Sequence, residues 1–261
     1  MISRSGPPAA RFLQGIGKHA SIEPDAYTQG GYVLSIGGAE QSHVNLADPH
    51  EVFYEYLRRI ANVVDLAAPP GQAVHALHLG AGALTLARYI QATRPGSRQY
   101  AVELERELLD FVLQHLPLPE GTDLTAIVGD ARESLADLPA GLSFDIIILD
   151  IFSGPEAPAH IACSEFYGEA ADRLAPGGVL IVNVGDEPGL SLVRSQVAAM
   201  RGVFQTVAAT AEAGMFAGRY PGNIVLVGTQ DPWPEEWTAS LNSRGPHPAN
   251  VLAGVELDAL N

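Results

Sequence analysis

Hydrophobic and polar residues follow two alternating patterns along most of the chain. After residue 71, short β-prone runs alternate with stretches whose apolar residues recur every three or four positions, as in helices. Several of the short runs, such as Ile146–Leu149, are apolar without interruption, which is typical of parallel strands covered by helices on both faces. The pattern predicts an α/β domain with a Rossmann-like, seven-stranded, mostly parallel sheet. We expect its strands near residues 73–79, 98–103, 123–128, 144–149, 177–184, 203–209 and 223–229.

The residues before position 71 have a different pattern. Two short β-prone runs, 31–36 and 41–46, are separated by Gly37 and Gly38, which can supply the positive φ angles of a hairpin turn. From His50 to Leu66 the apolar spacing predicts an amphipathic helix. The first thirty residues have little periodicity, so a loose or edge-strand segment is expected there.

We therefore divide the chain at a Pro/Gly linker. Residues 1–70 are predicted to form a small N-terminal β-hairpin appendage with a linker helix, and residues 71–261 the Rossmann-like domain. The residues after Thr229, which include four prolines, are expected to form irregular cover. A ligand of such a domain lies across the carboxyl ends of the strands, so residues at those ends are the first candidates for function.

Composition narrows the function classes. The 261 residues are 47% hydrophobic and 17% charged, which excludes a disordered or coiled-coil chain. Fifteen Lys and Arg against thirty Asp and Glu give a net charge of −15, which argues against a nucleic-acid partner and is compatible with a cationic substrate. Cys163 is the only cysteine, so a disulfide within the chain and a thiolate zinc site are excluded. No apolar run is long enough for a membrane helix or a signal peptide, and we expect a cytoplasmic protein with no metal.

The first two strands of the domain end in residues suited to a nucleotide. Gly80 and Gly82 follow the first strand and let backbone N–H groups approach a ligand at the start of a helix, although a tight turn alone would also explain them. Glu103 ends the second strand, about twenty residues later, where a carboxylate can accept two hydrogen bonds from a ribose diol. A solvated glutamate is the alternative.

The third and fourth strands also end in carboxylates. Asp130 and the adjacent backbone N–H of Ala131 could bind the amino group and ring nitrogen of an adenine, but Asp130 could equally be a helix N-cap. Asp150 follows an apolar run and precedes a Gly/Pro loop, so it is partly desolvated and suited to act as a general base or to bind a cation. A loop cap is the alternative for Asp150.

Four such strand ends in this order resemble the class I S-adenosylmethionine-dependent methyltransferase fold. More narrowly, the chain resembles the spermidine synthase-like (polyamine aminopropyltransferase) family over roughly residues 30–229. Ordinary methyltransferases lack the hairpin appendage and the Tyr-Pro-Gly segment before the last strand. The narrower resemblance lies in Gly37–Gln41, Asp48–Pro49, Phe53–Glu55, Gly129–Ala131, the Asp150 loop through Pro158–Ala159, Phe166–Tyr167, Pro176–Gly178 and Tyr220–Gly222.

The resemblance implies a role for each matching residue. Gly80, Gly82, Glu103, Asp130 and Ala131 would bind the nucleotide, with Glu103 on the ribose and Asp130 on the adenine. Asp150 would be the general base that deprotonates an amine as it attacks decarboxylated S-adenosylmethionine. A homodimer is also implied. Residues of the small-molecule amine pocket would be Gln41, Tyr54, Ser153 and Tyr220.

Two departures from the family pattern keep other activities open. Ala83 stands where the family has an aspartate that anchors the aminopropyl amine, and Ser153 stands where it has a second aspartate in the catalytic loop. Both lost carboxylates would offset ammonium groups, so the acceptor amine is not identified. A methyltransferase using intact S-adenosylmethionine and a nucleotide-binding protein without turnover are the alternatives. NAD is disfavoured because the glycine segment lacks the third glycine of the dinucleotide motif.

Overall fold

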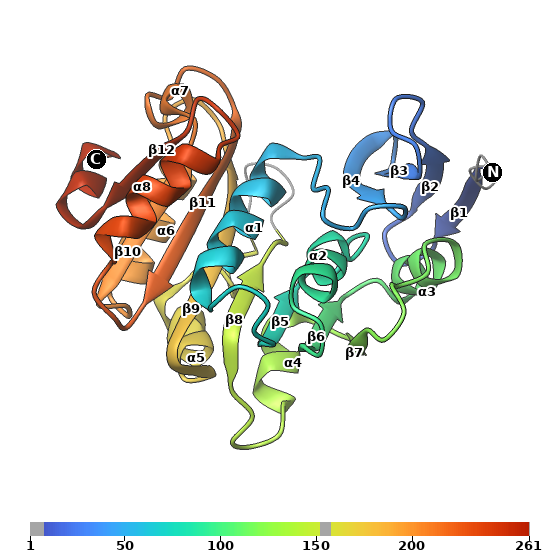
Figure 1. The fold of residues 1–261 in the computed structure, drawn as a ribbon, viewed down its shortest axis with the longest axis horizontal. Coiled ribbons are helices and arrows are strands. Elements are labelled where there is room, and N and C mark those ends of the chain that lie inside the picture. Colours follow the sequence, from blue (N-terminus) through green and yellow to red (C-terminus); the bar gives the residue numbers. More distant parts are fainter. Residues whose placement is uncertain (1–7, 152–157, 261) are drawn as a thin grey trace.

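The structure is a computed structural model that describes residues 8–151 and 158–260. Two sheets form its framework (Figure 1). A four-stranded antiparallel sheet is built from the N-terminal residues, and an eight-stranded sheet forms the centre of the remaining chain. Ser153, one of the predicted pocket residues, lies outside the described residues.

The N-terminal sheet has the order β1-β2-β3-β4, with β1 at Ala9–Leu13, β2 at Lys18–Pro24, β3 at Gly31–Ile36 and β4 at Ala39–Asn45. The predicted hairpin is β3–β4, and its two-residue turn has φ of 61° at Gly37 and 83° at Gly38. The segment expected to be loose or an edge strand forms the paired strands β1 and β2, and β1 is an edge strand of this sheet. Of these two strands only Leu13, Ala20 and Ile22 are buried apolar residues, too few to decide between the two possibilities from sequence.

The central sheet has the order β12-β10-β11-β9-β8-β5-β6-β7. Its parallel part confirms the predicted α/β class and consists of β5 (His75–Leu79), β6 (Arg98–Glu103), β7 (Asp123–Val128), β8 (Phe144–Leu149) and β9 (Leu174–Asp186). The antiparallel strands are β10 (Thr206–Ala211), β11 (Gly222–Thr229) and β12 (Asn250–Ala253). All seven predicted strands occur, and β12 is an eighth that the pattern did not predict.

Helices cover both faces of this sheet, which is why its central strands are apolar throughout (Figure 1). One face packs against α1 (Glu55–Ala67), α2 (Thr85–Thr93) and α8 (Glu235–Arg244). The other packs against α4 (Ala131–Asp137), α5 (Ser164–Ala171) and α6 (Ser191–Arg201). The helix α3 (Arg106–His115) packs between β6 and the N-terminal sheet. A short helix α7 (Ala213–Phe216) follows β10.

The C-terminal residues are more regular than expected. After β11 the chain forms α8, β12 and a 3-10 helix at Gly254–Leu260. The helix α8 buries only Leu241, so it has no apolar periodicity to mark it in the sequence. No helix in the described ranges is long and apolar enough to cross a membrane.

Candidate functional site

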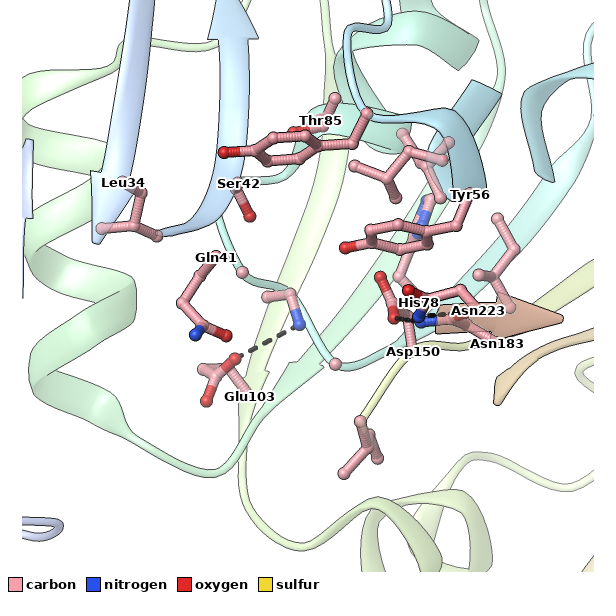
Figure 2. Close-up of a pocket in the computed structure, with 18 of the residues that line it drawn as sticks. Leu34, Gln41, Ser42, Tyr56, His78, Thr85, Glu103, Asp150, Asn183 and Asn223 are labelled. Atoms are coloured by element: carbon pink, nitrogen blue, oxygen red, sulfur yellow. Dashed lines mark hydrogen bonds between the residues drawn. The ribbon is translucent and has the colours of Figure 1, made fainter. Parts of the chain in front are cut away.

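A pocket of about 1020 Å³ opens at the carboxyl ends of the parallel strands, where β4 and the start of α1 face the glycine loop (Figure 2). Nine of the ten predicted site residues line it, and Ser153 is the exception because it is not described. Among the described residues, the lining is strongly acidic, with seven carboxylates, one arginine and no lysine. These are Glu40, Glu55, Glu103, Glu105, Asp130, Asp150 and Glu212, with Arg59. Such a lining favours cationic ligands over anions.

The glycine loop holds Glu103 in place. Gly80 has a φ of +95° and its N–H donates to the Val102 carbonyl at 3.0 Å, which ties the loop to β6. Glu103 Oε2 accepts a hydrogen bond from the Ala81 N–H at 3.2 Å (Figure 2), and Oε1 accepts one from the Glu105 N–H at 3.0 Å. The side chain is therefore an oriented carboxylate at a strand end and not a solvated glutamate. Each of its oxygens keeps a lone pair with which it can accept a further hydrogen bond.

Asp130 is the N-cap of α4, one of the two possibilities that the sequence left open. Its Oδ1 accepts hydrogen bonds from the N–H groups of Arg132 at 2.9 Å and Glu133 at 3.2 Å. Its Oδ2 lies 2.8 Å from His160 Nε2. Partial burial acts to raise the pKa of Asp130, but the hydrogen bonds from His160 and the two amides hold it below its usual value. Ala131 follows at the first position of α4 and also lines the pocket.

Asp150, directly after β8, begins a hydrogen-bonded chain that continues through a residue of β9 to a residue of β11. Its Oδ1 accepts from Asn183 Nδ2 at 2.8 Å, and Asn183 Oδ1 accepts from Asn223 Nδ2 at 3.0 Å (Figure 2). Burial raises the pKa of Asp150 to about 6, although the Asn183 hydrogen bond acts in the opposite direction. A carboxylate with this pKa is mostly ionised at neutral pH and is a stronger base than an ordinary aspartate.

The sequence reasoning missed the two asparagines, which line the pocket together with a buried histidine. Asn183 is 2% exposed, and a polar side chain inside the apolar run of β9 is a signal that could have singled it out. His78 lines the same pocket, and its Nε2 lies 3.0 Å from Gln99 Oε1. Burial lowers the pKa of His78 to about 4, so the imidazole is neutral at pH 7. These hydrogen bonds fix the orientation of the polar side chains that line this part of the pocket.

The predicted substrate residues lie on both sides of Asp150. Gln41 is on the Glu103 side in Figure 2. The Tyr54 hydroxyl donates to Glu40 Oε2 at 2.9 Å, and burial raises its pKa. Tyr220 is hydrogen-bonded to Glu212, which raises the pKa of the phenol. Both tyrosines therefore remain protonated at neutral pH and can act as hydrogen-bond donors.

The position of Ala83 shows how the site departs from its expected pattern. Ala83 is 1% exposed and belongs to the apolar cluster shared by the N-terminal sheet and α3. Its N–H donates to Ser42 Oγ at 3.4 Å, and Thr85 Oγ1 donates to the His43 carbonyl at 3.1 Å. The N-terminal sheet is therefore joined to the glycine loop by hydrogen bonds and apolar contacts where the resemblance implies an acid. Among the described residues no group of three or more His, Cys, Asp and Glu is arranged to hold a metal ion.

The structure of the chain is similar to several solved structures. A probable spermidine synthase from Corynebacterium glutamicum matches with a TM-score of 0.82 and 33% identity, over 90% of this chain and 87% of that one. A spermidine synthase in complex with the transition state analogue AdoDATO has a TM-score of 0.60 at 14% identity. Human methyltransferase-like protein 13 in complex with SAH has 0.56 at 19% identity. The last two similarities show the fold alone.

Curated sequences give the same family. The polyamine aminopropyltransferase of Chromobacterium violaceum is 26% identical over 203 residues, which are 76% of this chain and 72% of that protein. A probable polyamine aminopropyl transferase from Bifidobacterium longum is 30% identical over 121 residues, 46% of this chain but about a quarter (26%) of the relative's length. No protein-family model matches. Because the Corynebacterium protein is similar over nearly its whole length and shares the fold, the chain belongs to the spermidine synthase family of polyamine aminopropyltransferases.

Proposed function

We propose that the protein transfers an aminopropyl group from decarboxylated S-adenosylmethionine to an amine. The observation that carries the proposal is Asp150, a carboxylate whose pKa is raised to about 6 and which stands in the middle of an acidic pocket. Its family supports the same reaction, because the relatives that define it are described as aminopropyltransferases or spermidine synthases. The acidic lining suits this chemistry, since both the sulfonium donor and the amine acceptor are cations.

The nucleotide would bind at the glycine-loop end of the pocket. In this proposal the ribose hydroxyls donate to the Glu103 carboxylate, which the loop amides already hold in place. The adenine lies near Asp130 and Ala131, where its amino group competes with His160 for Asp130 Oδ2. A spermidine synthase of the same fold binds AdoDATO, and this supports an adenosyl ligand here.

The reaction needs one base and correct positioning. The nitrogen of the acceptor amine attacks the aminopropyl carbon bonded to the sulfonium, the carbon–sulfur bond breaks, and its electron pair remains on sulfur as methylthioadenosine leaves. The proton lost by the amine goes to Asp150. Asn183 occupies Oδ1, so Oδ2 is the oxygen proposed to take the proton. The hydrogen-bonded asparagines keep that oxygen directed at the bound amine.

A methyltransferase that uses intact S-adenosylmethionine is the second candidate, and the buried Ala83 favours it. The aspartate that the family has at this position would repel the carboxylate of intact S-adenosylmethionine. This protein has an alanine there, so the repulsion is absent. Fold similarity to a methyltransferase in complex with SAH is compatible with either activity.

One experiment separates the candidates. Purified protein is given decarboxylated or intact S-adenosylmethionine with putrescine, cadaverine or spermidine, and both thioether products are followed. We expect methylthioadenosine, and its loss in Asp150→Asn. Formation of S-adenosylhomocysteine would establish the methyltransferase instead. Tight nucleotide binding without either product would indicate a nucleotide-binding protein without turnover.

We further propose that the protein is a cytoplasmic homodimer: the family resemblance implies the dimer, and a single cysteine fits a reducing compartment. Sedimentation velocity measures the oligomeric state directly. A monomer at micromolar concentration would contradict the dimer and leave the proposed reaction unaffected.

A further inference from the structure

Arg59 of α1 is buried in the pocket wall with part of its guanidinium unpaired. The residue is 4% exposed and lines the pocket. Its Nη2 donates to the Pro246 carbonyl at 3.0 Å and to the Pro248 carbonyl at 3.4 Å. Its Nη1 is also buried, and no described residue accepts a hydrogen bond from it. An unpaired buried donor on a cation is costly, so a ligand toward which the guanidinium turns to donate from Nη1 would be bound favourably.

The strand order places Arg59 at the end of the pocket opposite the nucleotide. Glu103 ends β6, Asp150 follows β8, and Glu212 follows β10, which lies beyond β9 and β11 on the other side of Asp150. Burial lowers the pKa of Arg59, while Glu55, Glu212 and Tyr220 act to raise it, so these groups are its electrostatic neighbours. Arg59 is therefore at the end where an acceptor, and not the adenosine, would extend.

The helix face connects this end with the catalytic base. Glu55, Tyr56 and Arg59 are three and four residues apart and share one face of α1. Tyr56 is close enough to Asp150 for that carboxylate to raise its pKa, next to the larger effect of burial. Arg59 follows Tyr56 by about 5 Å along the helix axis. A molecule reacting at Asp150 needs only a short aliphatic chain to reach Arg59.

The charges at this end fit a head group that has both signs. A simple diamine would present an ammonium, which Glu55 and Glu212 attract and Arg59 repels. The head group of an α-amino acid matches all three side chains: its ammonium would bind the carboxylates of Glu55 and Glu212, and its carboxylate would accept from Arg59 Nη1. We propose that the acceptor is an α,ω-diamino acid, whose ω-amine reacts at Asp150 while its carboxylate binds Arg59; this rests on the proposed aminopropyl transfer.

The reaction is unchanged in its balance. The ω-amine nitrogen forms the new bond to the aminopropyl carbon, the carbon–sulfur bond breaks with its electrons remaining on sulfur, and the amine proton goes to Asp150. The α-ammonium stays protonated between the two glutamates and does not react. Arg59 therefore selects the acceptor and also holds the reacting amine at a fixed distance from the base.

Matched acceptors test the proposal. With decarboxylated S-adenosylmethionine as donor, putrescine is compared with ornithine and cadaverine with lysine, because each pair differs only by a carboxylate. Methylthioadenosine release gives kcat/KM for each acceptor. We expect wild-type protein to prefer the carboxylated member of each pair, and Arg59→Gln to reduce that preference roughly tenfold or more by removing a charged hydrogen bond.

A neighbouring arginine provides the control. Arg58 lies on the same helix but bonds to Asn62, Asp65 and Tyr89 and does not line the pocket. Arg58→Gln should leave the acceptor preference unchanged. If Arg59 only held the carbonyls of Pro246 and Pro248, its loss would lower kcat/KM for all four acceptors equally, and that result would overturn the inference.

The remaining outcomes are also decisive. A wild-type preference for the simple diamines would overturn the diamino-acid acceptor while supporting aminopropyl transfer. No methylthioadenosine from any of the four acceptors or from spermidine, with the protein folded by circular dichroism, would instead contradict the proposed function. If Arg59→Gln does not fold, Arg59→Lys and the wild-type preference decide, because a lysine retains the charge with fewer donors.

Discussion

A Cβ atom on Gly80 would lie 2.3 Å from the carbonyl oxygen of Asp150. The glycine loop after β5 and the residue after β8 therefore touch through their backbones, and the Asp150 N–H also donates to the Leu79 carbonyl at 2.9 Å. This contact fixes the proposed base against the proposed nucleotide loop. Glycine is required at position 80 both for this close approach and for its φ of +95°.

Gly80→Ala should therefore displace Asp150 and destabilise the fold. Backbone strain and the clash together should lower the free energy of unfolding by about 2–4 kcal/mol and reduce kcat. Gly71→Ala is the matched control, because Gly71 has a φ of +74° with open space around it and should lose only the strain component. Urea unfolding measures both. Equal losses in the two variants would show that the contact with Asp150 has little effect.

Asp150→Asn should abolish turnover and at the same time stabilise the protein at neutral pH. Burial raises the pKa of Asp150 from 3.8 to about 6, so the folded state binds a proton that the unfolded chain releases at a lower pH. The contribution of protonated Asp150 to the free energy of unfolding is then fully present below about pH 4 and is lost as the pH rises through about 6. Removing the charge should add about 1–3 kcal/mol at pH 7.5.

The pH dependence distinguishes this effect from altered packing. The stability gain of Asp150→Asn should disappear below about pH 3, where the aspartate is protonated in both the folded and the unfolded state. In the wild-type enzyme, kcat/KM should rise with pH through about 6 as the base ionises. Asn183→Ala removes the hydrogen bond that lowers the pKa of Asp150, so its rising limb should shift to higher pH. An unshifted profile would remove Asn183 from this role.

The strand ends could be predicted from sequence because a parallel sheet brings them to one edge. Glu103, Asp130 and Asp150 follow apolar runs, and alternation with helices is enough to predict that they meet. The pairing of Asn183 with Asp150 and Asn223 could not be predicted in the same way. It depends on β9 lying between β8 and β11 in the sheet. The order of the strands in the chain does not indicate this, because β10 precedes β11 in sequence but β11 is the strand that pairs with β9.

Elements with few inward side chains were predicted incompletely or missed. The strands β1 and β2 and the helix α8 are fixed by packing on neighbours and have little apolar periodicity of their own. Arg59 was hidden for a related reason, since an arginine on an amphipathic helix is normally solvated and nothing in the sequence shows that the residues near Pro246 cover it. Tertiary context decides such positions.

Glu103→Ala should weaken binding of methylthioadenosine by roughly tenfold to a hundredfold, because the ribose hydroxyls lose a charged acceptor. Its oxygens also accept from the Ala81 and Glu105 amides, so Glu103→Gln should retain part of the affinity by keeping one acceptor oxygen. Calorimetry gives the dissociation constants. Asp110→Ala, which removes an exposed carboxylate from α3, is the control and should change nothing. Binding of NADH without binding of methylthioadenosine would contradict the nucleotide site itself.

Leu84 should show an inverted order of alanine and glycine substitutions. It precedes α2 in the left-handed region with φ of 59° and ψ of 31°, and its side chain is 2% exposed. Both Leu84→Ala and Leu84→Gly lose buried surface, about 2–5 kcal/mol, but glycine also relieves about 1 kcal/mol of backbone strain. Leu84→Gly should therefore be the more stable of the two by urea unfolding. Leu86 lies within α2, so there Leu86→Ala should be more stable than Leu86→Gly by about 1 kcal/mol. The same order at both positions would mean that the loop relaxes and Leu84 is not strained.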